Sequence, residues 1–116
     1  MNNKDSVVVF VTAGSREEGE KIAGKIIEER LAACCNLVGP VTSFFWWDDK
    51  VERNEEMLLI IKTSSETFEK LKNRVRELHS YSVPEIIALP VTAGLEEYLT
   101  WIYDETVLKK SLIPGP

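Results

Sequence analysis

Histidine and cysteine are scarce in this chain, and their scarcity narrows the chemistry that it can perform. The sequence has one histidine, His79, and two adjacent cysteines, Cys34 and Cys35. Two neighbouring cysteines do not make a disulfide framework, and this usage favours a reducing, cytosolic setting. A Ser-His-Asp or Cys-His mechanism would have a single possible base, and no G-x-S-x-G or H-E-x-x-H motif accompanies it. The sequence therefore favours binding over catalysis.

Long apolar runs and an excess of positive charge are also absent. No run approaches the ~20 residues that span a bilayer, and the start MNNKDSVVVFV lacks the apolar length of a signal peptide. A net charge of -5 repels a phosphate backbone. Gly14 and Gly19 fit neither a Walker A sequence nor G-x-G-x-x-G. We expect one cytoplasmic domain that is not an enzyme, needs no cofactor and has neither nucleic acid nor membrane as a partner.

The first half of the chain predicts a strand, a helix and a second strand. Val7–Val11 is a continuous β-branched and aromatic run, which favours a strand buried on both faces, although a buried helix stays open at this length. Ser15 and Glu18 form a capping box, and the apolar pairs at 22–23 and 26–27 continue it as an amphipathic helix. Gly39-Pro40 then predicts a bulge or bend in the next strand.

The second half predicts a further strand between two helices. Residues 68–78 carry an apolar stripe at helical spacing, with a capping sequence at 63–66. Pro84 ends this helix, residues 85–91 read as a short strand, and Gly94 opens a third helix. The order βαββαβ plus a terminal helix indicates a ferredoxin-like α+β sandwich.

All 116 residues are expected to belong to one domain, with a core over about 6–107. The segment 108–116 ends in Ile-Pro-Gly-Pro, and we expect it to leave the fold as a flexible tail.

The stretch from Phe44 to Lys62 predicts a β-hairpin too long for its domain, turning at Asp48-Asp49-Lys50. Its returning strand, 51–63, would span about 43 Å at ~3.3 Å per residue. A domain of this length measures about 35 Å across. The hairpin should therefore overhang, and its aromatic edge needs a cover, which another copy of the chain supplies most simply.

Several sequence blocks, in order, resemble the CutA family of divalent-cation tolerance proteins. The similarity extends over about Val7–Thr106. It rests on Leu31-Ala32-Ala33-Cys34, Val41-Thr42-Ser43, Trp46-Trp47, Leu59–Thr63, Pro84–Pro90 and Tyr98-Leu99-x-Trp101. The resemblance implies a small cytosolic protein of ferredoxin-like fold, related in architecture to PII signalling proteins and assembled as a tight homotrimer. It also implies an association with copper and other divalent metals.

The chain departs from the family pattern where copper ligands are found. Members assigned a copper site have a cysteine in the first strand and two histidines at the end of the second helix. Here these positions hold Val11 and Leu78, so only His79 remains. One imidazole, with thiols far from it in the sequence, makes a weak binding site for copper. We therefore expect copper or zinc to bind weakly, through His79 with carboxylate or water oxygens, or His79 to act only as a helix cap.

For a small ligand, the predicted site consists of Lys62, Tyr81 and Glu85, with Trp46 as a wall. These residues come from strand ends and the loop before Pro84, where polar groups can converge beside the hairpin of a neighbouring subunit. Lys62 and Glu85 carry opposite charge and should lie within about 6 Å of each other or share one cavity. The alternative, that Lys62 is an edge residue whose amine reaches solvent, is equally open.

Three functions stay open at this point. The first is a homotrimeric module that binds divalent cations or a small ligand between its subunits. The second is a trimeric adaptor or PII-like signalling protein with no metal role. The third is a cryptic thiol or hydrolytic enzyme that uses Cys34 and His79.

Overall fold

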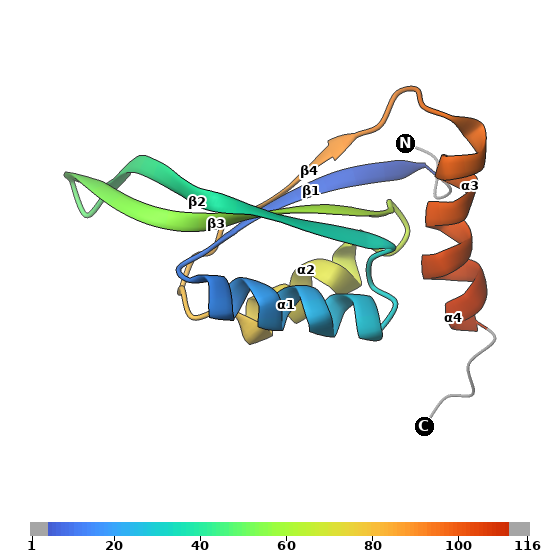
Figure 1. Cartoon of the computed structure of the whole chain (residues 1–116), viewed down its shortest axis with the longest axis horizontal. Coiled ribbons are helices and arrows are strands. Elements are labelled where there is room, and N and C mark those ends of the chain that lie inside the picture. Colours follow the sequence, from blue (N-terminus) through green and yellow to red (C-terminus); the bar gives the residue numbers. More distant parts are fainter. Residues whose placement is uncertain (1–4, 112–116) are drawn as a thin grey trace.

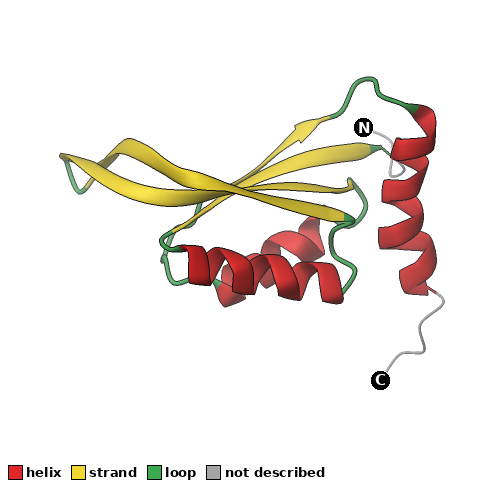
Figure 2. Ribbon diagram, in the orientation of Figure 1, coloured by secondary structure: helices red, strands yellow, loops and turns green. Residues whose placement is uncertain are grey.

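A computed structural model of the chain describes residues 5–111, which form an α+β fold (Figures 1 and 2). Within this range, four strands make one antiparallel sheet in the order β2-β3-β1-β4. The elements are β1 (Ser6–Ala13), α1 (Arg16–Glu28), β2 (Cys34–Trp47), β3 (Lys50–Ser64), α2 (Phe68–Leu78), β4 (Ile86–Pro90), α3 (Glu96–Tyr103), the π-helical turn η1 (Asp104–Leu108) and α4 (Lys109–Ser111). The predicted order of strands and helices, βαββαβ and then a helix, is confirmed.

Helices α1 and α2 lie together on one face of the sheet, and the core fills the space between them and the strands (Figure 1). Val7, Val9 and Val11 of β1 point into this core and are almost fully buried. Val8 and Phe10, which alternate with them, face the other side of the sheet and are only half-buried. The prediction that this strand is buried on both faces is therefore wrong for the isolated chain, because the helices cover one face.

The start of α1 follows the predicted capping box. Ser15 Oγ accepts a hydrogen bond from the Glu18 amide at 3.1 Å, and Glu18 Oε1 accepts one from the Gly14 amide at 3.1 Å. The cap predicted for the second helix is wrong, because α2 begins at Phe68 behind Thr67, which makes no side-chain cap. Ser64 belongs to β3, and its hydroxyl instead lies 2.7 Å from that of Thr67.

The C-terminal helix is longer than the sequence predicted and begins later. It starts at Glu96 rather than at Gly94 and continues through η1 and α4 to Ser111. Arg30 donates to the Glu105 carbonyl at 3.0 Å and Lys110 to the Glu29 carbonyl at 3.2 Å, which ties this helix to the end of α1. The predicted tail is therefore wrong for 108–111, and its remainder, 112–116, lies outside the described residues.

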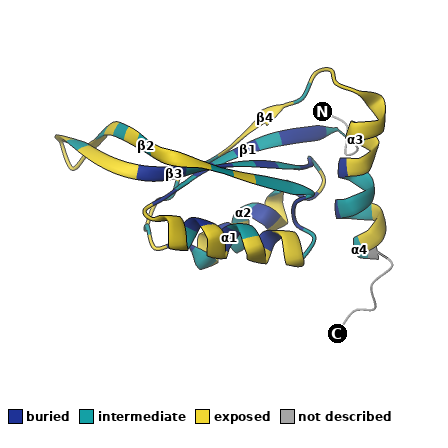
Figure 3. Cartoon of the chain, viewed as in Figure 1, coloured by how far each residue is buried: buried dark blue, intermediate teal, exposed yellow. Residues whose placement is uncertain are grey.

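The hairpin of β2 and β3 turns at Asp48 and Asp49, whose φ angles of 54° and 62° suit the short polar side chain of aspartate. The register shifts between Val38 and Val41, so the bulge predicted at Gly39-Pro40 is confirmed. Beyond it the hairpin projects past the helices, as Figures 1 and 3 show. The molecule measures 46 × 35 × 22 Å, and the predicted overhang is present.

Two glycines of α1 should respond differently to alanine. Gly24 is exposed in the helix interior and a Cβ there meets no atom within 4 Å, so Gly24→Ala should raise the free energy of unfolding by about 0.5–1 kcal/mol. A Cβ at the buried Gly19 would lie 3.3 Å from Leu37 Cδ2, so Gly19→Ala should lose that gain. Urea unfolding at one fixed protein concentration measures both; a destabilised Gly24→Ala would contradict this account.

Candidate functional site

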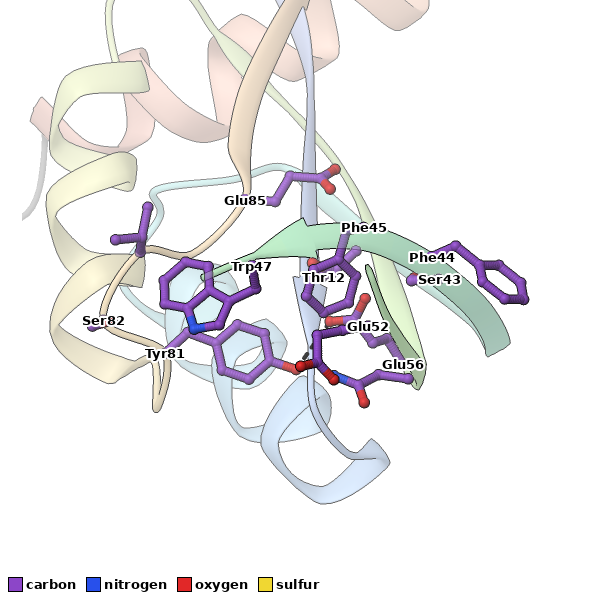
Figure 4. A pocket seen from close by; sticks show the side chains of 12 residues that line it. Thr12, Ser43, Phe44, Phe45, Trp47, Glu52, Glu56, Tyr81, Ser82 and Glu85 are labelled. Atoms are coloured by element: carbon purple, nitrogen blue, oxygen red, sulfur yellow. Dashed lines mark hydrogen bonds between the residues drawn. The ribbon is translucent and has the colours of Figure 1, made fainter. Parts of the chain in front are cut away.

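A cavity of about 650 Å³ lies under the hairpin, where β2 and β3 pass over the end of β1 and the loop that leads into β4 (Figure 4). Its volume suits a small molecule. Aromatic and acidic side chains dominate the lining. The lining residues are Thr12, Ser43, Phe44, Phe45, Trp47, Glu52, Asn54, Glu56, Tyr81, Ser82, Val83 and Glu85.

The alternation of side chains along β2 decides which aromatic residues face the cavity. Phe45 and Trp47 share one face of the hairpin with Glu52, which pairs with Phe45 across the strands. Figure 4 shows Phe44 pointing away from this group. Trp46 lies on the face opposite Trp47 and is 74% exposed. Within one chain, Trp47 therefore forms the wall of the cavity, and the prediction of Trp46 for this role is wrong. A role of Trp46 in the site of a neighbouring subunit stays a prediction.

Glu56 and Tyr81 form the polar centre of the cavity. Glu56 is 6% exposed, and its Oε2 accepts a hydrogen bond from the Tyr81 hydroxyl at 2.9 Å. Burial and this carboxylate raise the pKa of Tyr81 to about 12. Gly14 makes room for the hydroxyl, since a Cβ at that position would lie 3.1 Å from it. The phenol therefore stays protonated and acts as a donor at neutral pH.

Glu85 adds a further carboxylate at the rim of the cavity. Burial and the proximity of Glu56 raise the pKa of Glu85 above its ordinary value. The lining holds three glutamates and, within residues 5–111, no lysine, arginine or histidine. The cavity is therefore acidic, and its carboxylates repel one another when they are ionised.

His79 lies behind the cavity with both ring nitrogens engaged. Nδ1 accepts a hydrogen bond from the Tyr81 amide at 3.0 Å, so Nε2, at 2.7 Å from the Thr12 carbonyl, carries the proton and donates it. The side chain is 0% exposed. The loop before β4 is thereby fixed to the end of β1, and metal binding at His79 requires that one of these hydrogen bonds breaks.

Glu18 fastens the same loop to the start of α1. Its Oε2 accepts a hydrogen bond from the Ser80 amide at 2.7 Å, and its Oε1 accepts from the Gly14 amide. Burial raises the pKa of Glu18, but the hydrogen bonds from Ser80 and Gly14 outweigh it, so the net pKa lies below the ordinary value. The ionised carboxylate thus stabilises the position of Tyr81 from one residue away.

Lys62 lies away from the cavity, so the prediction that it shares one with Glu85 is wrong within a single chain. On β1, Lys62 pairs with Val8, whereas Ile86 pairs with Val11 and Glu85 lies one step beyond it. Four residues of strand, about 13 Å, separate these levels. The Lys62 amine instead contacts the Asn36 amide oxygen and lies 4.0 Å from Cys34 Sγ.

The two cysteines separate as their adjacent positions on a strand predict. Cys35 packs against the core, where burial raises the pKa of its thiol to about 12, and Cys34 lies on the other face beside Lys62. Cys35 therefore acts as a small, half-buried apolar residue packed against the core.

Across residues 5–111, no group of three or more His, Cys, Asp or Glu side chains is arranged to hold a metal ion. Weak metal binding through His79 therefore stays a prediction. Tyr81 and Glu85, by contrast, are brought together at one cavity, although their role in ligand binding remains untested.

Sequence analysis missed Thr12, Trp47 and Glu56 as site residues. Glu56 carried the clearest available signal, because Glu52, Asn54 and Glu56 alternate along β3 and so share one face. The sequence alone does not show that Tyr81 folds back against this face. Glu56 becomes a site residue only through this contact between β3 and the loop before β4.

Fold and cavity together define a class: a small α+β protein with a ligand-sized acidic cavity under an overhanging hairpin. The family model described as "CutA1 divalent ion tolerance protein" matches residues 7–105. The chain belongs to this family, which is named for ion tolerance and not for a reaction.

Relatives of known name support the assignment. The chain is 48% identical over 99 residues to the divalent-cation tolerance protein CutA of Thermus thermophilus, covering 85% of this chain and 96% of that protein. It is 46% identical over 101 residues to the chloroplastic protein CutA of Arabidopsis thaliana, covering 87% of this chain but only 56% of that longer protein.

Solved structures have the same fold. The structure of the divalent cation tolerance protein from Thermus thermophilus superposes with a TM-score of 0.86 at 46% identity, covering 87% of this chain and 98% of that one. The structure named as the periplasmic divalent cation tolerance protein CutA of Archaeoglobus fulgidus gives 0.84 at 42% identity, covering 87% and 98%.

Replacing Glu18 should remove a pH-dependent contribution to stability. Since the folded pKa of Glu18 is lowered, its ionised form stabilises the fold above the ordinary glutamate pKa of about 4.3, and this contribution is lost as the pH falls through the folded value. Glu18→Gln should therefore be less stable than the parent by about 1–2 kcal/mol near pH 7, and the difference should shrink when the pH is lowered to about 3.

The control for this experiment is Glu17→Gln, which changes the exposed neighbour of Glu18. Urea midpoints at both pH values, at one protein concentration, give the comparison. A Glu18→Gln penalty that is the same at both pH values would show that the charge of Glu18 is not what fastens the loop.

Proposed function

We propose that this protein acts in divalent-cation tolerance as a homotrimer of ferredoxin-like subunits, with a small ligand or divalent cation bound in the cavity under each hairpin. One observation carries the proposal: the hairpin displays large apolar side chains beyond the reach of the chain's own helices. Tolerance itself comes from the family and from the names of its relatives.

The exposed surface of the hairpin supports assembly. Phe44 is 67% exposed, Trp46 74%, and Val51, which pairs with Trp46, 60%. Side chains of this size that lie together on one face are typical of a contact surface rather than of a solvated one. The outer edge of β2 has no partner strand within residues 5–111, so its backbone groups are also available to another copy.

The face of the sheet that no helix covers also supports assembly. Val8 and Phe10 of β1 are half-buried there, and Ile87 and Leu89 of β4 are 51% and 44% exposed. These four side chains lie next to one another, since Val8 pairs with Leu89 and Phe10 with Ile87. A second apolar surface beside the hairpin gives a trimer enough area to bury, on the order of 1,000 Å² or more per subunit.

A weakly bound divalent metal ion is one candidate for the proposed ligand. Carboxylate oxygens are suitable ligands for hard divalent cations, and Glu56 and Glu85 supply them at one cavity. Copper or zinc would use His79 only after displacing its hydrogen bonds to Thr12 or Tyr81.

A second candidate function is a trimeric adaptor or PII-like signalling protein that holds no metal. The engagement of both His79 ring nitrogens favours it, since the one histidine of the chain then serves the fold. Metal titration followed by calorimetry distinguishes the two candidates.

The cellular location belongs to the proposal as well. No helix within residues 5–111 is long and apolar enough to cross a membrane. We propose the cytoplasm on the cysteine usage of the sequence. The names of relatives include a chloroplastic and a periplasmic protein, so fractionation of cells that express the chain is the relevant measurement.

Sedimentation velocity at micromolar concentration should give a single species of trimer mass, and the trimer should depend on the hairpin. Phe44→Ser combined with Trp46→Ser should shift the population towards monomer, because both changes remove exposed apolar area. Ile27→Ser, which removes a 39% exposed side chain from α1, is the matched control and should leave the trimer intact. A monomeric parent protein would refute the proposed assembly.

A further inference from the structure

We propose that the cavity under the hairpin binds an organic cation, namely a primary ammonium or guanidinium group attached to a small apolar body. The inference rests on the proposed function in taking this cavity as the ligand site, and it narrows the ligand to one chemical class. It is carried by a buried carboxylate that opens onto an aromatic cavity, with further carboxylates close by.

The cation would be held by Glu56. This residue is only 6% exposed, yet of its two carboxylate oxygens only Oε2 accepts a hydrogen bond, from Tyr81. No described residue donates to Oε1. This atom is not fully buried, because every fully buried side-chain oxygen in residues 5–111 has a partner, and Glu56 lines the cavity. A buried carboxylate with one free oxygen is a strong acceptor for a charged donor.

The surrounding charge selects against anions. Glu52 and Glu85 line the same cavity as Glu56, and no basic side chain of residues 5–111 offsets them there. Burial and the nearby Glu56 carboxylate raise the pKa of Glu85, as a neighbouring negative charge does. A ligand cation relieves this repulsion, whereas an anion or a neutral group does not.

The apolar part of the ligand would lie against aromatic rings. Phe45, Trp47 and Tyr81 border the cavity on the side of the carboxylates, as Figure 4 shows. Rings of this kind attract ammonium and guanidinium groups through their faces and also bury hydrocarbon. The combination of rings and carboxylates is the usual environment of an organic cation in proteins.

A bare metal ion fits the same cavity less well. A volume of about 650 Å³ is typical of pockets for small organic molecules. The three glutamates also do not form a cluster able to hold a metal, since no such group is present in the described part of the chain. An ammonium or guanidinium group needs only one or two carboxylates at hydrogen-bond distance.

Calorimetry of the full chain with three probes tests the inference. Benzylamine, which is a cation at neutral pH, should bind; benzyl alcohol and benzoate have the same ring but no positive charge and should not. In Glu56→Gln the affinity for benzylamine should fall about tenfold, a factor that corresponds to about 1.4 kcal/mol. Glutamine keeps an oxygen for the Tyr81 hydroxyl, so the variant preserves the local fold.

Glu66→Gln serves as the matched control, because Glu66 is exposed and lies beyond the opposite end of β3. It should bind benzylamine as the parent does. Glu85→Gln provides a second charge variant and should weaken binding as well, which keeps the test usable if Glu56→Gln fails to fold.

Two results would overturn the inference. One is benzoate binding as tightly as benzylamine. The other is that the parent binds zinc chloride but not benzylamine, and that Glu56→Gln no longer binds zinc. This result would assign the cavity to metal and leave the proposed function intact. Sedimentation of the same samples separates these results from a failure of the proposed trimer.

Discussion

The length of β3 is the constraint on which the rest of the structure depends. Its inner half pairs with β1 on one side and β2 on the other, and supplies Leu59 and Ile61 to the core. Its outer half has only β2 as a partner, because β1 ends at Ala13 opposite Met57. The same strand thus builds the core of the chain and, beyond it, pairs with the aromatic stretch of β2.

The cavity is a consequence of this arrangement. Glu56 lies one residue beyond the last β1 partner of β3, where the hairpin leaves the sheet, and the loop before β4 fills the adjacent space with Tyr81. The side chains of His79 and Glu18 hold that loop through hydrogen bonds with backbone groups of Thr12, Tyr81 and Ser80. His79, the predicted metal ligand, thus also positions this loop, and Glu56 of β3 supplies the polar centre of the cavity.

Much of the fold could be predicted from local patterns, but contacts distant in sequence could not. The capping box at Ser15, the bulge at Gly39-Pro40 and the alternation of Cys34 and Cys35 depend on neighbouring residues, and the structure contains all three. The separation of Lys62 from Glu85 depends on the register of β1 with both β3 and β4, which no local pattern specifies. The helix to Ser111 likewise depends on Arg30 and Lys110.

The central claim is that another copy of the chain covers the outer half of the hairpin. Hydrogen exchange of the backbone amides in 41–47 of β2 tests it most directly, because an edge strand leaves its outward amides open to water. The account predicts slow exchange of these amides at micromolar protein and faster exchange when dilution dissociates the assembly. Exchange of the outward amides that is fast at every concentration would contradict it.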